Sequence, residues 1–147
     1  MKSCRLIYKS VARPDLLEGG GLQELLDECV EHNNKLGIKG LLVVSGDRIL
    51  QVLEGPATFV NELFRSIVTD DRHADVELVT YEGQGGSHFY DWSMRLVRLD
   101  QLEPAIKDLM CRKYPHERGV IRFPDDLIQV YSLLLDAKAL GAVADGD

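Results

Sequence analysis

The sequence has little of what membrane proteins, disulfide-stapled proteins and metalloproteins need. Its apolar runs all stop well short of the ~20 residues that cross a bilayer, and its N-terminus runs directly into a strand-like pattern. We therefore expect neither a membrane span nor a signal peptide. Its three cysteines have no paired spacing, which indicates reduced thiols in a cytoplasmic protein. His73, His88 and His116 lack ligand spacing with cysteine or with one another, so no metal site is expected.

Positive charge and phosphate-binding loops are also scarce. The 17 Lys and Arg residues are outnumbered by 24 Asp and Glu residues, and the formal net charge of −7 argues against nucleic acid and membrane surfaces as main partners. The glycine clusters at 19–21 and 83–86 do not join a strand to a helix that begins with Lys-Ser/Thr, so no P-loop is predicted. With 45% hydrophobic residues, the chain can nevertheless bury a real core.

The hydrophobic pattern changes period several times along the first hundred residues. Five segments have the alternating or continuous apolar pattern of strands, at 4–10, 40–45, 48–54, 76–82 and 92–98. Two segments repeat apolar residues at helical spacing, at 22–35, which Gly37 ends, and at about 60–70. The order βαββαββ predicts an α+β, ferredoxin-like sheet with both helices on one face. In that topology the first and third strands are antiparallel neighbours at the centre.

Two further helices are expected after residue 99. The first has Pro104 in its first turn, and its apolar face is expected to hold Leu102, Ile106, Leu109 and Met110. The second is expected to be capped by Asp125 and to carry Leu127, Val130, Tyr131 and Leu134 on its apolar face. Leu133, Leu134 and Leu135 are candidates for shielded packing, either against the free sheet face or in an oligomer contact.

Three polar residues interrupt patterns that should be apolar, and such interruptions tend to mark functional sites. Gln51 lies mid-strand, where an unpaired buried amide would cost ~1–3 kcal/mol, Tyr8 lies on the strand expected beside it, and Asn33 extends the apolar face of the first helix. Each has an ordinary alternative: a structural or solvated amide, a packed ring with a wet hydroxyl, and a residue near a helix end. Together they would converge between sheet and helices, and they would suit a planar heteroaromatic ligand with amide-like edges.

Five short segments between residues 3 and 98 carry a family resemblance. They are Arg-Leu-Ile-Tyr-Lys-Ser (5–10), His-Asn-Asn-Lys-Leu-Gly-Ile-Lys-Gly-Leu-Leu (32–42), Leu-Gln-Val-Leu-Glu-Gly (50–55), Asp-Asp-Arg-His (70–73) and Phe-Tyr-Asp-Trp-Ser-Met (89–94). In this order and with this spacing they resemble the BLUF domain, the sensor of blue light using FAD. The blocks at 50–55 and 89–94 are specific only when they occur together.

The resemblance implies a flavin ring held between the two helices over the sheet. By position, Tyr8 matches the family's photoactive tyrosine, Gln51 the glutamine that bridges it to the flavin, and Asn33 the asparagine on the ring's carbonyl edge. Trp92 and Met94 match a fifth-strand pair that rearranges near the glutamine. The other residues that the resemblance assigns to cofactor binding are Ser10, His32, Arg65 and Asp70.

Two departures from the family pattern concern the phosphate end of the cofactor. Gly86-Ser87-His88 stands where many relatives have basic residues, and Ser66 stands where some have an arginine, with Arg65 adjacent. The expected cofactor is FAD. FMN and riboflavin remain alternatives, because the family binds the flavin mainly through its ring.

The resemblance also implies what the protein does. It indicates a blue-light photoreceptor, not an enzyme, in which light switches the hydrogen bonds among Tyr8, Gln51 and flavin. Since the chain has no room for a cyclase or kinase domain, we expect the short stand-alone type, which signals by contact with another protein and often forms homo-oligomers. We divide it into a sensor domain (1–99), a C-terminal helical cap or output segment (100–140) and a flexible tail (141–147). The alternatives are a small flavin-dependent oxidoreductase and a flavin-free ferredoxin-like interaction module.

Overall fold

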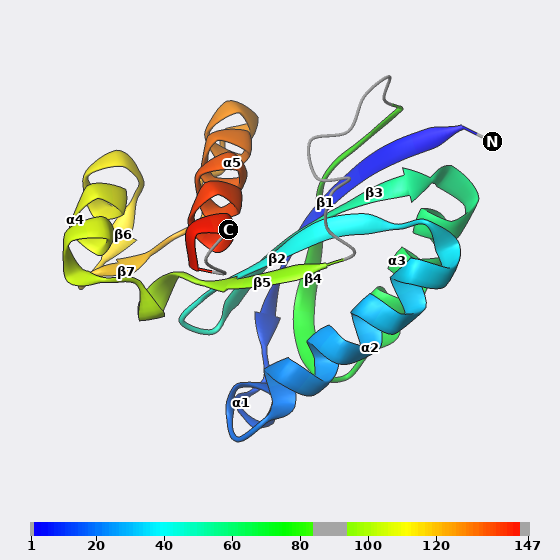
Figure 1. Ribbon diagram of the computed structural model, residues 1–147, viewed down its shortest axis with the longest axis horizontal. Coiled ribbons are helices and arrows are strands. Elements are labelled where there is room, and N and C mark those ends of the chain that lie inside the picture. The colour runs from blue at the N-terminus through cyan, green and yellow to red at the C-terminus, as the bar shows by residue number, and fades with distance from the viewer. Residues whose placement is uncertain (1, 84–93, 145–147) are drawn as a thin grey trace.

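Five strands form one sheet in the order β4-β1-β3-β2-β5 (Figure 1). The computed structural model describes residues 2–83 and 94–144, with side chains as far as 141. The strands are β1 (Ser3–Ala12), β2 (Lys39–Ser45), β3 (Arg48–Pro56), β4 (His73–Gly83) and β5 (Arg95–Arg98). All neighbours are antiparallel except β2 and β5, which are parallel. The predicted ferredoxin-like α+β fold is confirmed, with β1 and β3 paired antiparallel at the centre.

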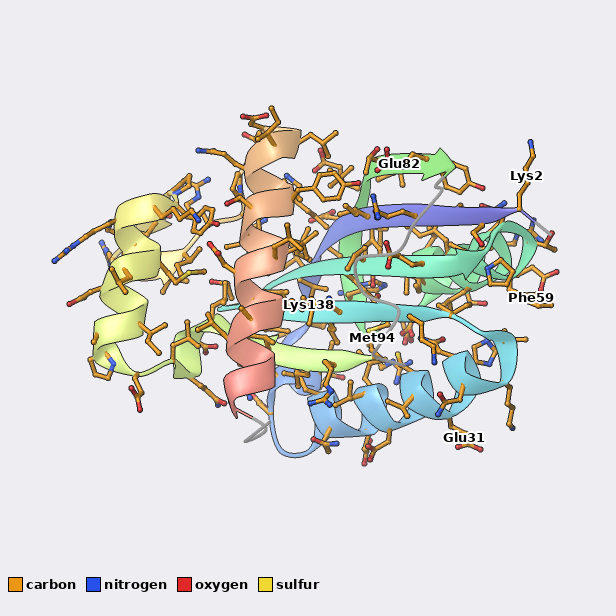
Figure 2. The ribbon with its side chains drawn as sticks, turned by 45° about the horizontal axis from the view of Figure 1, so that its top comes forward. Lys2, Glu31, Phe59, Glu82, Met94 and Lys138 are labelled. Carbon is orange, nitrogen blue, oxygen red and sulfur yellow. The ribbon has the colours of Figure 1, made fainter. Side chains whose placement is uncertain are left out.

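Helices cover both faces of the sheet. The helices α2 (Gly21–Leu36) and α3 (Ala57–Thr69) share one face, as predicted, and α5 (Leu127–Ala144) crosses the strands on the other (Figures 1 and 2). Because side chains alternate along a strand, neighbouring residues enter different cores. Leu6 and Leu53 pack in the core under α2 and α3, while Ile7 and Val52 pack in the core under α5.

Polar contacts also hold α5 on the sheet. The Tyr131 hydroxyl donates to Glu82 of β4 and accepts a hydrogen bond of 3.3 Å from Arg5 of β1. Arg5 in turn donates to Glu54 of β3 at 2.7 Å, and both of these side chains are nearly fully buried. A buried ion pair costs free energy unless its groups are well hydrogen-bonded. Tyr131 supplies one such bond from the helix side, so α5 is tied directly to β1 and β4.

Helix α2 ends where the sequence predicts. Gly37 adopts a left-handed conformation with φ of 71°, and its N–H donates to the Asn33 carbonyl. Glycine occupies this position because a side chain would be strained there. The backbone can then turn directly into β2.

Some local elements were not predicted from the sequence. The short helix α1 (Pro14–Leu17) follows β1, and a small hairpin, β6 (His116–Glu117) and β7 (Val120–Ile121), follows α4 (Pro104–Lys113). A 3-10 turn, η1 (Leu99–Gln101), precedes α4. The fifth strand was expected from residue 92 but begins at Arg95. Helix α5 runs to Ala144, beyond residue 141, where the flexible tail was predicted to begin.

Not every apolar residue of the C-terminal helices is buried in this chain. Leu109 of α4 and Leu135 of α5 are 62% and 43% exposed, so the packing proposed for Leu135 is not made against the sheet. Leu127 is also exposed, because it lies at the first turn of α5. The α5 cap is Asp126, whose carboxylate accepts the Ile128 N–H at 3.1 Å. The predicted cap, Asp125, instead pairs with Lys9 of β1 at 3.3 Å. Among the described helices, none is long and apolar enough to cross a membrane.

Candidate functional site

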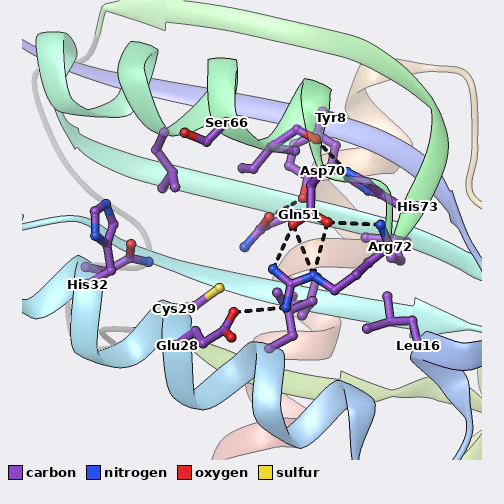
Figure 3. A pocket seen from close by; sticks show the side chains of 16 residues that line it. Tyr8, Leu16, Glu28, Cys29, His32, Gln51, Ser66, Asp70, Arg72 and His73 are labelled. Carbon is purple, nitrogen blue, oxygen red and sulfur yellow. Dashed lines mark hydrogen bonds and ion pairs between the residues drawn. The ribbon is translucent and has the colours of Figure 1, made fainter.

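A pocket of about 310 Å³ lies between the sheet and the helices α2 and α3 (Figure 3). Its walls are largely apolar, formed by Leu16, Leu25, Leu42, Ile49, Leu63 and Ile67. Its polar lining comes from Tyr8, Glu28, Cys29, His32, Asn33, Gln51, Ser66, Asp70, Arg72 and His73. A mostly apolar cavity with a few convergent polar groups is typical of a site for a small organic ligand.

Tyr8 and Gln51 meet on the sheet side of this pocket. They are direct partners across β1 and β3, so both side chains point to the same face. The Tyr8 hydroxyl donates to Gln51 Oε1, and each residue is only 3% exposed. Burial raises the pKa of Tyr8 far above its usual value, and the neighbouring Cys29 and Asp70 raise it further. The phenol is therefore held in its neutral, proton-bearing form.

The amide of Gln51 continues the chain of hydrogen bonds to Met94. Gln51 Nε2 lies 3.4 Å from Met94 Sδ, which is a weak acceptor. A hydroxyl donor on one side and an acceptor on the other both favour the same amide orientation, with the oxygen toward Tyr8. Met94 is buried directly before β5, so the amide connects the pocket to the edge strand.

A charged cluster joins the two helices at the pocket. Arg72 follows α3 and donates to both carboxylate oxygens of Asp70, to Oδ2 at 2.7 Å and to Oδ1 at 3.1 Å, and to Glu28 of α2 at 2.9 Å (Figure 3). The hydrogen bonds from Arg72 lower the pKa of Asp70, and the bond to Asp70 raises the pKa of Arg72. Asp70 and Arg72 are therefore both charged over the whole neutral range. Arg72 offers the guanidinium donors that suit a carbonyl or phosphate group.

His73 ties Ser10 to the edge of the pocket. Its Nε2 lies 2.7 Å from the Ile67 carbonyl and its Nδ1 lies 2.8 Å from Ser10 Oγ. Since a carbonyl only accepts, Nε2 carries the proton, and Ser10 donates to Nδ1. The imidazole stands edge-on to the Tyr8 ring, with 6.2 Å between centroids. Ser10 thus acts on the pocket through His73 and is not itself part of the lining.

The structure brings together most of the residues nominated from the sequence. Tyr8, His32, Asn33, Gln51 and Asp70 line the pocket. Met94 touches the pocket only through Gln51. Arg65 is exposed and is not among the lining residues, whereas its neighbour Ser66 is. Trp92 lies outside the residues that the structure describes.

Sequence reasoning missed four polar lining residues, Glu28, Cys29, Arg72 and His73. Two of them, Arg72 and His73, belong to the Asp-Asp-Arg-His segment. Of that segment, only Asp70 was predicted to bind the cofactor. Glu28 and Cys29 precede His32 by one helical turn, so the face of α2 that carries His32 and Asn33 could have revealed them. Burial raises the pKa of Cys29 to about 11, which keeps the thiol neutral. In the part of the chain that the structure describes, no group of three or more His, Cys, Asp or Glu residues could hold a metal ion.

Comparison with known proteins decides the family. The model of the BLUF family, sensors of blue-light using FAD, matches residues 4–95. The chain belongs to the BLUF family. The solved dark-state structure of BlrB, a BLUF protein, matches with a TM-score of 0.71 and 26% identity, over 95% of this chain and 96% of that one.

Two curated proteins share this BLUF domain as part of longer chains. The chain is 28% identical over 116 residues to the blue light- and temperature-regulated antirepressor BluF of Escherichia coli (strain K12). It is 27% identical over 109 residues to photoactivated adenylate cyclase subunit alpha of Euglena gracilis. These matches cover 74% and 72% of this chain, but only 28% and 11% of the relatives' lengths.

The pocket of this BLUF domain fits the ring of a flavin. An isoalloxazine is a planar, largely apolar ring system with carbonyl and N–H groups along one edge. The pocket offers apolar walls from both helices, and its buried amides Asn33 and Gln51 can each donate and accept. The paired charges of Asp70 and Arg72 add a donor for a carbonyl and an acceptor for an N–H.

Proposed function

We propose that this chain senses blue light through a non-covalently bound flavin and signals by contact with another protein. The observation that carries the proposal is the buried hydrogen bond from Tyr8 to Gln51, continued from Gln51 to Met94. It joins an oxidisable phenol on the pocket side to a strand that leads into the C-terminal helices. Such an arrangement supports a hydrogen-bond switch, because the amide can present either its oxygen or its nitrogen to each neighbour.

Different residues of the pocket lining would bind different parts of the cofactor. Asn33 and the pair of Asp70 and Arg72 would hold the polar edge of the ring, and His32 would lie alongside it. Ser66 would face the side chain of the cofactor, in place of the Arg65 expected from the sequence. We propose FAD as the natural form, following the family. FMN or riboflavin would keep the same ring contacts.

The residues of the chain supply the proton movements of the switch. A bound flavin would supply a blue-light-driven oxidant that takes up one electron and one proton and then gives both back. Tyr8 is a neutral donor, since burial raises its pKa, and it holds its proton against Gln51 Oε1. If Tyr8 gave up an electron, and a proton through the amide, and then recovered both, Gln51 would be left rotated or in its other tautomer. The contact with Met94 then changes, while no covalent bond to the cofactor remains.

This arrangement favours a sensor over the two alternatives. A flavin-dependent oxidoreductase needs room for a substrate beside the reactive edge of the ring, and Tyr8 and Gln51 would fill that position. A flavin-free interaction module would have no need for a cavity with two buried amides. The stand-alone sensor type, a homo-oligomeric state and a cytoplasmic location stay predictions from the sequence, as does the division at residues 99 and 140.

Absorption spectroscopy tests the proposal directly. The purified chain, reconstituted with FAD, should absorb in the blue, and its spectrum should shift to the red under blue light without added reductant. In the dark the shift should reverse. A chain that stays colourless after reconstitution would exclude the sensor, and a colour that bleaches only with a reductant would indicate the oxidoreductase.

A further inference from the structure

A groove of about 510 Å³ lies between α4 and α5, at the end of the molecule away from α2 and α3 (Figure 1). Its apolar lining consists of Ile106, Leu109, Met110, Ala139 and Leu140. Its charged lining consists of Arg112, Lys113 and Asp136. The groove is separate from the flavin pocket and has no role in the proposed photochemistry.

Two helical stripes form the walls of this groove. On α4, Ile106, Leu109 and Lys113 follow one another at spacings of three and four residues, and on α5 Asp136 and Leu140 do the same. Leu109 is 62% exposed, although α4 is otherwise amphipathic and well placed to bury it. On the opposite wall, formed by α5, Ala139 has only a small side chain. Two helices that present a shared apolar slot are completed by a third helix packed along it.

The charged lining of the groove is positive on balance. Lys113 and Asp136 offset each other, because they pair at 2.9 Å, and the Tyr114 hydroxyl also donates to Asp136 at 2.5 Å. Arg112, one turn beyond Leu109, is the third charged residue of the lining. Residues 104–122 contain five Lys or Arg and two Asp or Glu, whereas acids outnumber bases in the chain as a whole. A partner that matches this surface carries carboxylates beside its apolar residues.

We propose that the groove between α4 and α5 binds an acidic, amphipathic helix of the downstream partner. The partner's apolar side chains would cover Leu109 and Leu140, and its carboxylates would meet Arg112 at the rim. This inference rests on the proposed function, since it names the kind of partner that receives the signal. The acidic helix of this chain, α2, cannot be that occupant, because its apolar face already packs in the core beside the pocket.

The position of the groove also connects it to the sensor. Met110 of α4 and Leu133 of α5 share a core cluster with Val97 of β5, and β5 begins one residue after Met94. A change at Met94 therefore needs to pass through only one layer of packed side chains to reach the groove walls. Packed side chains transmit such small displacements because interiors are close to incompressible.

Two model peptides test the proposal on the full, flavin-loaded chain. One is a helix of about four turns with leucines along one face and glutamates on both flanks, and its twin has lysine in place of every glutamate. Fluorescence anisotropy should show binding of the acidic peptide and at least about tenfold weaker binding of its twin. Leu109→Ser and Arg112→Glu should each weaken the acidic peptide by about tenfold or more, as loss of a central anchor does. The matched control is Leu135→Ser, on α5 outside the groove, which should bind as the unchanged chain does.

Other outcomes would overturn the proposal. Equal binding of both peptides, or unchanged binding by Leu109→Ser, would show that the groove does not select this partner. If Leu109→Ser lowers the oligomeric mass in sedimentation, a second copy covers the groove. If the unchanged chain binds vesicles of anionic lipid and Leu109→Ser does not, the groove is covered by a membrane surface instead.

The absorption spectrum distinguishes a failure of this inference from a failure of the photoreceptor proposal. Leu109 and Arg112 lie outside the flavin pocket, so both variants should keep the reversible red shift. If the shift is present but the acidic peptide does not bind, this inference fails alone. If the unchanged chain shows no shift, the photoreceptor proposal fails, and peptide binding then describes a module of another kind.

Discussion

At the scale of single residues, the phenol of Tyr8 and the amide of Gln51 are the decisive pair. Each is buried and each is the other's partner, so removing either one leaves a polar group without its hydrogen bond. An orphaned buried group of this kind costs ~1–3 kcal/mol. The two side chains therefore depend on each other, and a coupled polar pair inside an apolar pattern is expected at a functional site.

Replacing either partner should separate cofactor binding from switching. We expect Gln51→Leu and Tyr8→Phe to retain flavin, since Asn33 and Arg72 still line the pocket for the proposed ring contacts, but to lose the red-shifted state. The exposed Gln101→Leu is the matched control and should behave as the unchanged chain does. Spectra before and after illumination measure the effect. A normal red shift in either pocket variant contradicts the roles assigned to both.

The carboxylate of Asp70 should make stability depend on pH. Hydrogen bonds from Arg72 lower its pKa in the folded chain below the value that it has when unfolded. Its stabilising contribution is therefore complete above the unfolded pKa, and it is lost as the pH falls through the folded pKa. We expect Asp70→Asn to lower the free energy of unfolding at pH 7, and we expect the gap to the unchanged chain to close in acid.

Urea denaturation at a series of pH values measures that gap. The neighbouring, exposed Asp71→Asn is the control, and its gap should be small at every pH. A gap for Asp70→Asn that stayed constant down to pH 3 would mean that the ion pair with Arg72 contributes nothing to stability.

At the scale of secondary-structure elements, the sequence predicts strands and helices well where one buried face produces a long periodic apolar pattern. The strands β1 and β3 and the helices α2 and α3 were placed within a few residues, because each has a long periodic apolar pattern. Tyr8 and Gln51 were found because a polar residue inside such a pattern is conspicuous. Glu28 and Arg72 were missed because charged residues are ordinary on a helix surface and after a helix. Only the approach of α2 to the segment after α3 brings them together.

The C-terminal helices show the limit of periodicity. Leu109 and Met110 both fit the apolar stripe of α4, yet one is exposed and the other buried. Likewise Leu134 and Leu135 are neighbours in a run of leucines on α5, and only Leu134 faces the sheet. Spacing identifies a broad stripe of about 100°, and the position of the packing partner decides which edge of that stripe is covered.

That pair of leucines gives a direct test of how α5 packs. Leu134→Ala should lower the free energy of unfolding by about 2–5 kcal/mol, since the side chain is fully buried. Leu135→Ala should change it by less than about 0.5 kcal/mol. Chemical denaturation of both variants makes the comparison. Equal, small effects would mean that α5 is not part of the folded core.

At the scale of the whole molecule, the sheet lies between the flavin pocket and the C-terminal helix α5. One face carries the pocket, and the other face carries α5, which Tyr131 ties to β1 and β4. Gln51 and Met94 lie where the pocket meets the edge strand, and Val97 faces the core under α5. A signal that starts at the flavin must therefore cross the sheet to reach the C-terminal helices.

Met94 is the residue at which this crossing can be interrupted. Met94→Leu keeps a side chain of similar size, a change that cores tolerate well, but removes the sulfur that accepts from Gln51 Nε2. We expect the variant to retain flavin and a reversible red shift, because Tyr8 and Gln51 remain. In the unchanged chain we expect blue light to change amide hydrogen exchange in α5, and we expect Met94→Leu to lose this change. Exchange measured in the dark and under steady blue light, on both chains, provides the comparison.

The matched control is Met110→Leu, a buried methionine on α4 whose sulfur takes no part in the Gln51 network. It should preserve both the red shift and the light-induced change in α5. If Met94→Leu responds to light in α5 as fully as this control does, the thioether is not the link, and the signal leaves the pocket by another strand. If α5 in the unchanged chain exchanges at the same rate in light and dark, the helix is a static cover of the sheet. In that case the output surface must lie on the sensor domain itself.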